Sequence, residues 1–171
     1  MEVQSPDRLI RLAVDLVNAR ELRSPAELRT FLLEHGEPEP VEVDEDDLAS
    51  VRSVREWLRP VFEGDAGQGA RVLNAVLKRY AVRPYLSDHD GTPWHVHVAR
   101  PGASWAGWLA ATTALGLATF AAGHGFEALG VCAASDCERV FANAAEKRPR
   151  RFCTPRCATR TRVATYRARR H

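Results

Sequence analysis

The sequence has 171 residues, enough for one ordinary domain and a small appended module. Its composition, 45% hydrophobic and 27% charged, is typical of a soluble globular protein. It excludes the class of small proteins that depend on disulfide bonds or metal ions throughout the chain for want of a hydrophobic core. The net charge of +2 conceals a basic end: ten of the 24 Lys and Arg lie in residues 147–171 without any Asp or Glu, and the rest of the chain carries 14 basic against all 22 acidic side chains, a balance of −8.

The first part of the chain is predicted to be helical. Residues 1–15 lack the features of a secretory signal, so we expect a cytoplasmic location, in which disulfides are disfavoured. Apolar residues and start and stop signals predict helices over roughly residues 6–18, 24–36, 44–62 and 68–80. The second begins at a capping box of Ser24 and Glu27, with Pro25 at the first helical position. Asp44 caps the acidic first turn of the third.

The hydrophobic period changes in the middle of the chain. Residues 82–86 and 94–99 are predicted to form two short strands around the turn-rich residues 87–91. His95 and His97 would project from one face of the second strand, where they could bind a metal ion. They lack a clear third ligand, so a solvated strand face is favoured.

A neutral helix is predicted over residues 104–129, with Trp105 and Trp108 as core residues. Residues 101–123 contain no charged side chain and are long enough to span a bilayer. The stretch is rich in Ala, Gly and Thr, whereas membrane insertion favours Leu, Ile, Phe and Val. A buried, closely packed helix is therefore favoured, and no membrane partner is expected.

The four cysteines lie near the end of the chain as two close pairs, Cys132-x4-Cys137 and Cys153-x3-Cys157, with fifteen residues between the pairs. This arrangement is typical of a structural zinc site, in which four thiolates form a tetrahedron around one Zn²⁺. Four protein ligands leave no open position for a substrate, so the site is structural. The alternative, buried or disulfide-bonded cysteines, is disfavoured by the clustering and by a reducing compartment.

The residues around the cysteines predict the local structure of this zinc module. Residues 139–142 and 150–153 flank a polar turn, and we expect them to form a small hairpin. Thr154 is a candidate N-cap and Pro155 a candidate first helical residue, which places Cys157 in the first turn of a helix. A knuckle, a hairpin and a ligand-bearing helix make a treble-clef-like arrangement.

The helix after Cys157 and the turn before it are strongly basic, which favours nucleic-acid binding. Phosphate contacts give affinity through counterion release, and arginine suits guanine edges in the major groove. The candidate nucleic-acid-binding residues are Lys147, Arg148, Arg150, Arg151, Arg156, Arg160, Arg162, Arg167, Arg169 and Arg170. DNA is favoured. RNA is one alternative, with Tyr166 or Phe152 stacking on unpaired bases. A second alternative is a protein-interaction module that docks on an acidic partner or on residues 42–47.

The zinc module resembles the CGNR zinc-finger family of bacterial transcription regulators. The resemblance rests on Cys132-x4-Cys137, Val140-Phe141, Arg150-Arg151-Phe152-Cys153 and Cys157-Ala158-Thr159-Arg160 before the basic tail. Ala158 and Thr159 stand where the family has Gly and Asn, a difference that bears on sequence preference more than on zinc binding. Near the N-terminus, Asp15-Leu16-Val17-Asn18-Ala19-Arg20 is similar to the Asp-Leu-Val-Asn-Thr motif of the family's N-terminal domain.

The resemblance implies a DNA-binding regulator whose body senses a ligand. Dimerisation is a separate expectation, because a single short module covers only a small stretch of DNA. Asp15, Asn18 and Arg20 are the candidate residues for binding a small-molecule effector, although they could instead terminate a helix, as Asn commonly does. The sequence contains no phosphate-binding glycine loop, nucleophile elbow or metal-hydrolase motif, so we do not expect an enzyme.

The expected fold is α+β. Residues 1–130 form a mostly helical N-terminal domain with a β-hairpin, and residues 131–171 form the treble-clef-like zinc module that ends in the basic helix. The expected function is transcription regulation through DNA, with one structural Zn²⁺ and with a small-molecule effector and a homodimer as further partners.

Overall fold

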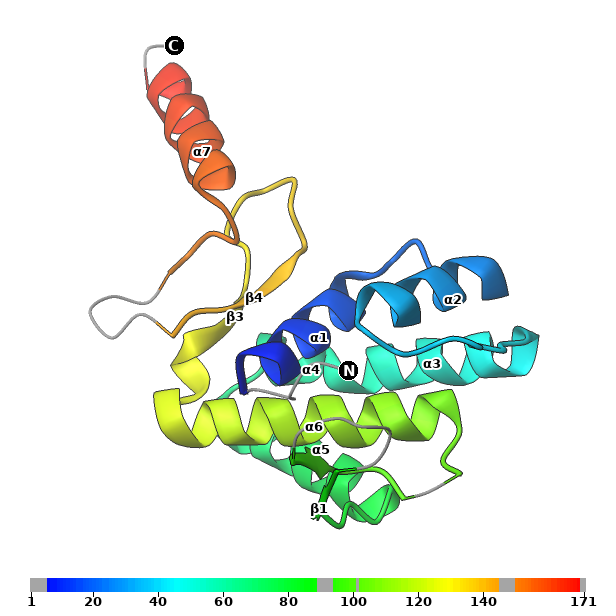
Figure 1. The fold of residues 1–171 in the computed structure, drawn as a ribbon. Coiled ribbons are helices and arrows are strands. Elements are labelled where there is room, and N and C mark those ends of the chain that lie inside the picture. The colour runs from blue at the N-terminus through cyan, green and yellow to red at the C-terminus, as the bar shows by residue number, and fades with distance from the viewer. Residues whose placement is uncertain (1–5, 89–93, 101, 145–149, 170–171) are drawn as a thin grey trace.

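Helices dominate the fold, which a computed structural model describes for residues 6–88, 94–100, 102–144 and 150–169 (Figure 1). The helices are α1 (Pro6–Asn18), α2 (Pro25–Glu34), α3 (Glu45–Leu58), α4 (Pro60–Glu63), α5 (Ala66–Arg79), α6 (Trp105–His124) and α7 (Pro155–Ala168). The strands are β1 (Tyr85–Ser87), β2 (His95–His97), β3 (Leu129–Val131) and β4 (Val140–Ala142). They form two separate antiparallel pairs, β1 with β2 and β3 with β4. The predicted α+β class is confirmed.

The neutral helix α6 is the centre of the body, and α1, α3 and α5 pack around it. It is apolar on all sides because neighbours cover most of it, as expected for a core helix. By length and composition α6 is long and apolar enough to cross a membrane, but most of its apolar stretch is buried inside the molecule. α1 approaches α6 closely at Gly116, which has no side chain where the backbone of Leu9 passes.

Local signals set most helix boundaries. Ser24 and Glu27 form the expected capping box at the start of α2, and Asp44 and Asp47 form another at the start of α3. The helix expected over residues 44–62 is interrupted at Pro60, which supplies no backbone N–H donor, and so divides into α3 and α4.

The prediction that the neutral helix continues to Leu129 was wrong. Gly125 adopts a positive φ of 79° after α6 and ends it, as glycine commonly does. A short 3₁₀ turn, η2 (Phe126–Ala128), then leads into β3.

The strand partner expected for residues 139–142 was also wrong. β4 pairs with β3, in the register Leu129 with Ala142 and Val131 with Val140, and not with residues 150–153. The reason is burial: Leu129 and Val140 both belong to the main hydrophobic core, so pairing these strands seals the body. Residues 150–153 approach the hairpin through a hydrogen bond from the Ala133 N–H to the Arg151 carbonyl, 2.8 Å long.

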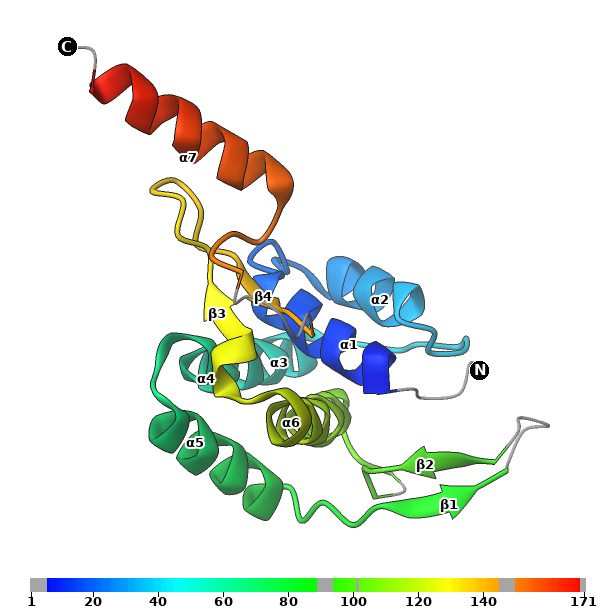
Figure 2. The ribbon, with the colours of Figure 1, turned by 90° about the vertical axis from the view of Figure 1, so that its left-hand side faces the viewer.

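The β3–β4 hairpin therefore belongs to two units at once. It packs against α1 and α4 of the body, and the chain that continues from it carries the cysteines. Beyond the cysteines, α7 extends away from the body in both views (Figures 1 and 2). The β1–β2 hairpin projects from a different part of the molecule (Figure 2).

Candidate metal centre and nucleic-acid interface

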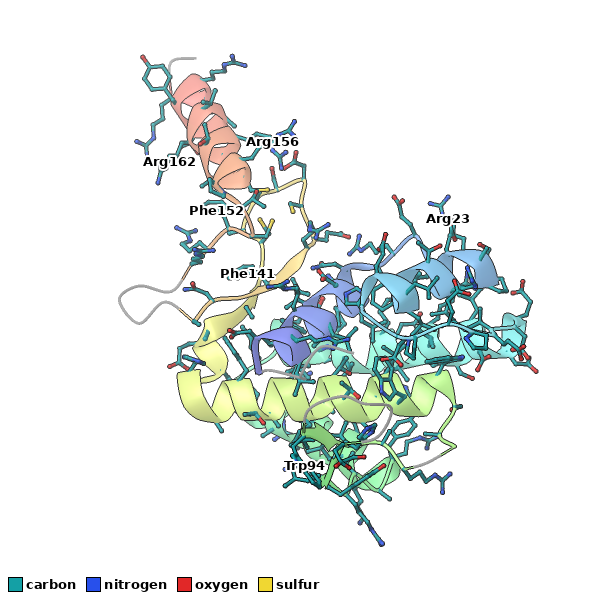
Figure 3. All side chains as sticks on the ribbon, in the orientation of Figure 1. Arg23, Trp94, Phe141, Phe152, Arg156 and Arg162 are labelled. Carbon is teal, nitrogen blue, oxygen red and sulfur yellow. The ribbon has the colours of Figure 1, made fainter. Side chains whose placement is uncertain are left out.

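The four cysteines meet where the chain from the β3–β4 hairpin reaches the base of α7 (Figure 3). Their Sγ atoms all lie within 4.8 Å of one another, and the Sγ of Cys153 lies 3.7 Å from those of Cys137 and Cys157. A disulfide would need about 2.05 Å. A tetrahedron with Zn–S bonds of about 2.3 Å has edges of about 3.8 Å. The donor set and its spacing therefore fit one structural zinc ion, with four protein ligands.

Backbone hydrogen bonds shape the first pair of cysteines into a knuckle. Cys132 follows β3 directly, and the N–H of Cys137 donates to the carbonyl of Ala134 at 3.0 Å, which turns the chain back. The N–H of Cys153 donates to the Sγ of Cys132 at 3.4 Å, so the second pair is tied to the first. Such N–H···S contacts orient metal-bound sulfurs.

A cation would stabilise the ionised form of the four-cysteine cluster. Burial opposes ionisation of Cys132, but N–H donors from Cys153 and Ala134 outweigh it and lower the pKa of its thiol to about 7. Burial and the neighbouring sulfurs raise the pKa of Cys153 to about 12. Once one thiolate has formed, further thiolates at this spacing repel it. A divalent cation removes this conflict, since zinc binds cysteine as thiolate.

The second pair fixes the start of α7. Thr154 is the N-cap and accepts a hydrogen bond from the N–H of Cys157 at 3.2 Å, with Pro155 in the first turn, as the sequence predicted. Within α7, which is described in full, Cys157 alone is buried. Val163 and Tyr166 are 43% and 60% exposed. The metal thus anchors one end of a helix whose remaining length is open to solvent.

Arg160 differs from the other arginines of α7. Its Nη2 lies 2.7 Å from the Asp136 carboxylate in the cysteine knuckle and 3.6 Å from the Sγ of Cys157. The side chain therefore bridges the two halves of the metal centre. Its positive charge also lies beside a cluster that carries two net negative charges when four thiolates hold one Zn²⁺.

The other basic candidates lie on the surface. Arg150, Arg151, Arg156, Arg162, Arg167 and Arg169 are exposed, and their side chains make no ion pair or hydrogen bond to the part of the chain that the structure describes. Arg156 and Arg162 leave α7 on different sides (Figure 3). Lys147, Arg148 and Arg170 lie outside the described residues.

The histidine pair of β2 remains a weak metal candidate. The ring of His97 stacks on Tyr85, with centroids 5.3 Å apart and an interplanar angle of 19°. The side chain of His95 lies outside the described part of the structure.

The three residues predicted to bind an effector, Asp15, Asn18 and Arg20, make contacts in two separate parts of the structure. His35 Nε2 lies 3.3 Å from an Asp15 carboxylate oxygen, which links α1 to the end of α2. Asn18 contacts β4 instead: its Nδ2 donates to the Val140 carbonyl, and its Oδ1 accepts from the Val140 N–H, both at 2.9 Å. The Asn18 amide thus continues the sheet like a short extra strand.

Arg20 acts close to Asn18. Its guanidinium pairs with the carboxylate of Glu138, and Nη2 of Arg59 donates to the backbone carbonyl of Glu138 at 3.1 Å. Together with Asn18 these contacts form a clamp that joins the body to the zinc module. The motif around Asn18 marked this residue as a candidate for function. No local sequence pattern indicated that its partner is Val140, 122 residues further along the chain.

Comparison with known families agrees with this architecture. A family described as the CGNR zinc finger matches residues 128–170, and the ABATE family, described as "Putative stress-induced transcription regulator", matches residues 11–135. The chain therefore belongs to the ABATE family and carries a CGNR zinc finger at its C-terminal end. No curated protein matches the sequence. The family assignment confirms the predicted resemblance, the zinc site and the role in transcription regulation.

Proposed function

We propose that this regulator binds duplex DNA through α7 and that the zinc centre holds α7 in position. The observation that carries the proposal is the geometry of α7: it extends from the molecule, only its first turn is anchored, and its sequence contains four arginines and no acidic residue. A helix of 14 residues is about 21 Å long, and the major groove, about 12 Å wide, admits a helix.

The exposed arginines suit phosphate contacts. They leave α7 on more than one side, so they can reach both walls of a groove, and Arg150 and Arg151 add charge at its base. We assign Arg160 to the metal centre instead, because Asp136 and Cys157 already engage its guanidinium. A DNA-binding regulator of this kind would need no catalytic step and would act in the cytoplasm.

α7 also has the properties of a helix that gains stability from a partner. An isolated helix of this length is marginal in water, and most helices are stabilised by packing of an apolar face. Here Val163 and Tyr166 are exposed. The exposure of Tyr166 among arginines favours RNA as the second candidate, since such a ring can stack on an unpaired base.

The clamp between Asn18 and β4 gives the body a way to control the position of α7. A ligand or a second copy that shifts α1 would also shift β4, because Asn18 binds the backbone of Val140. The position of α7 depends on the same module. Any such effector acts through its differential affinity for the two arrangements.

The test is fluorescence anisotropy of the zinc-loaded chain with labelled duplex DNA across a salt series. Each neutralised phosphate should contribute about −0.9 to the log–log salt slope. Arg162→Ala and Arg167→Ala should each make the slope shallower by about one. Arg71→Ala, an equal loss of charge at an exposed position of α5, should leave the slope unchanged.

Removing zinc with a chelator should abolish binding. A single-stranded RNA of equal length separates the two candidates: a preference for RNA would replace the DNA proposal. Absence of affinity for both in the zinc-loaded protein at low salt would contradict nucleic-acid binding and favour an acidic protein partner.

A further inference from the structure

A surface cavity of about 430 Å³, widely open to solvent, lies between the body and the zinc module. One wall is a stripe of α1 that includes Ile10, Arg11 and Val14, and the opposite wall comes from Arg139 and Phe141 at β4 and from Thr154 at the start of α7. The volume is in the range of sites that hold small organic molecules. The cavity lies at the junction through which the body and α7 are connected.

The polar groups of this cavity favour an anion. Arg11 and Arg139 line opposite walls, and neither side chain makes an ion pair or hydrogen bond to the described residues. The neighbouring Arg20 is paired with Glu138. Asp7 is the one carboxylate on the lining, and the zinc ligand Cys153, whose thiolate charge the metal compensates in part, lines it as well, so Arg11 and Arg139 are the cationic groups of the site. An anionic ligand could therefore accept charge-assisted hydrogen bonds from both walls.

Apolar side chains make up about half of the exposed lining. Ile10 and Val14 are partly exposed on the cavity side of α1, and Phe141 belongs to the opposite wall. An apolar body on the ligand would cover these side chains and remove their surface from water. A bare inorganic anion would leave this surface uncovered.

We propose that this cavity binds a small organic anion that carries an aromatic or aliphatic body. Thr154 both lines the cavity and caps α7, so a bound molecule would contact the turn that sets the direction of the basic helix. That the ligand acts as the effector of DNA binding rests on the proposed function. The binding site itself rests on the cavity and its charges.

The first test uses 8-anilinonaphthalene-1-sulfonate, an aromatic sulfonate whose fluorescence rises in apolar sites, with the zinc-loaded full chain. Arg11→Glu and Arg139→Glu should each weaken saturable binding by about tenfold or more, as expected for loss of a charge-assisted hydrogen bond. Val14→Trp, which fills the cavity without changing charge, should abolish it. Arg71→Glu on α5 is the matched charge control and should bind like the parent.

The exposed β1–β2 hairpin could also attract the dye, since Leu86 and Trp94 are each 65% exposed. Trp94→Ala should therefore leave the cavity component unchanged. Zinc content and circular dichroism establish that each variant is folded. Equal binding by Arg11→Glu, Val14→Trp and Arg71→Glu in folded proteins, or no saturable binding by the parent, would overturn the proposal.

Duplex anisotropy with the same variants keeps the two proposals distinct. Duplex binding without dye binding would overturn the cavity site and leave the proposed function intact. Dye binding that requires Arg11 and Arg139, in a chain without duplex affinity, would support the site and contradict the DNA function. If these arginines change the DNA salt slope but not dye binding, they belong to the nucleic-acid surface and the cavity proposal fails.

Discussion

Arg160 illustrates how neighbouring arginines on one helix can do different work. It contacts Asp136 in the knuckle and the Sγ of Cys157, whereas Arg162, two residues later, is exposed and without an ion pair to the described residues. Side chains next to metal ligands commonly tune affinity through orientation and charge. The same loss of charge at the two positions should therefore have different consequences.

Arg160→Ala should weaken zinc affinity by about tenfold or more, the usual range for loss of an outer-shell partner. Arg162→Ala should leave zinc affinity unchanged. Competition with a chromogenic chelator measures both. Arg160→Lys should fall between them, because lysine keeps the charge but not the planar fork. Equal zinc affinities for Arg160→Ala and Arg162→Ala would refute the role of Arg160.

Asn18 is the central contact of the clamp. Asn18→Ala should lower the free energy of unfolding by about 1–3 kcal/mol, because the N–H and carbonyl of the buried Val140 lose their partners. Asn18→Asp should be at least as damaging, since a carboxylate oxygen would face the Val140 carbonyl. Asn74→Ala, at an exposed position of α5, is the control, and chemical denaturation gives the three values. A loss no larger than that of Asn74→Ala would show that the clamp is dispensable.

His35 should make stability depend on pH. Burial disfavours its charged form, but the Asp15 carboxylate and the Phe31 carbonyl accept from the two ring nitrogens and raise its pKa above 6.5. A raised pKa means that the stabilisation is complete below pH 6.5 and is lost as the pH rises through the folded-state value. The difference in unfolding free energy between the parent and His35→Gln should therefore shrink with increasing pH. A difference that grows with pH would reverse this assignment.

At the scale of elements, the contact of α1 with α6 depends on one glycine. A Cβ on Gly116 would lie 2.7 Å from the Cβ of Leu9 and 2.9 Å from its backbone carbon, so the helices would have to separate. Gly123 lies in the same helix, and a Cβ there would meet nothing within 4 Å. The two positions separate helix propensity from packing.

Gly116→Ala should destabilise the protein by about 1–3 kcal/mol, because overpacking outweighs the gain in helix propensity. Gly123→Ala should stabilise it by up to about 1 kcal/mol, since only propensity changes. Thermal and urea unfolding measure both. Stabilisation by Gly116→Ala would mean that α1 does not approach α6 as closely as described.

At the scale of the whole molecule, the two ends of the zinc module differ in what stabilises them. Leu129 and Val140 are part of the large core of the body, whereas Cys132, Ala134 and Cys157 form a separate small cluster around the metal site. The hairpin should therefore survive loss of zinc, and the knuckle and α7 should not.

Chelation should remove a helical signal equivalent to about the 14 residues of α7 and leave the cooperative unfolding of the body in place. Trypsin should then cleave the arginine-rich α7 rapidly while sparing the helices of the body. Far-ultraviolet circular dichroism and limited proteolysis measure this, and Cys132→Ser with Cys157→Ser should reproduce the chelated state. Complete unfolding on chelation would show that the metal holds the body as well.

The sequence by itself determined what depends on neighbours in the chain. The capping box at Ser24, the start of α7 at Thr154 and Pro155, and the choice of four cysteines as zinc ligands all follow from spacing over a few residues. Local hydrogen bonding and ligand geometry decide such features, so a linear pattern carries them.

Only the tertiary structure decided the rest. The pairing of β4 with β3, the clamp from Asn18 to Val140 and the contact of Arg160 with Asp136 all join segments that no local pattern relates. Burial of Leu129 and Val140 in a shared core selects the strand partner, and the resulting docking brings the amide of Asn18 to the backbone of β4. These contacts depend on how the helices pack, because the free energy gained by burial is a property of the assembled core.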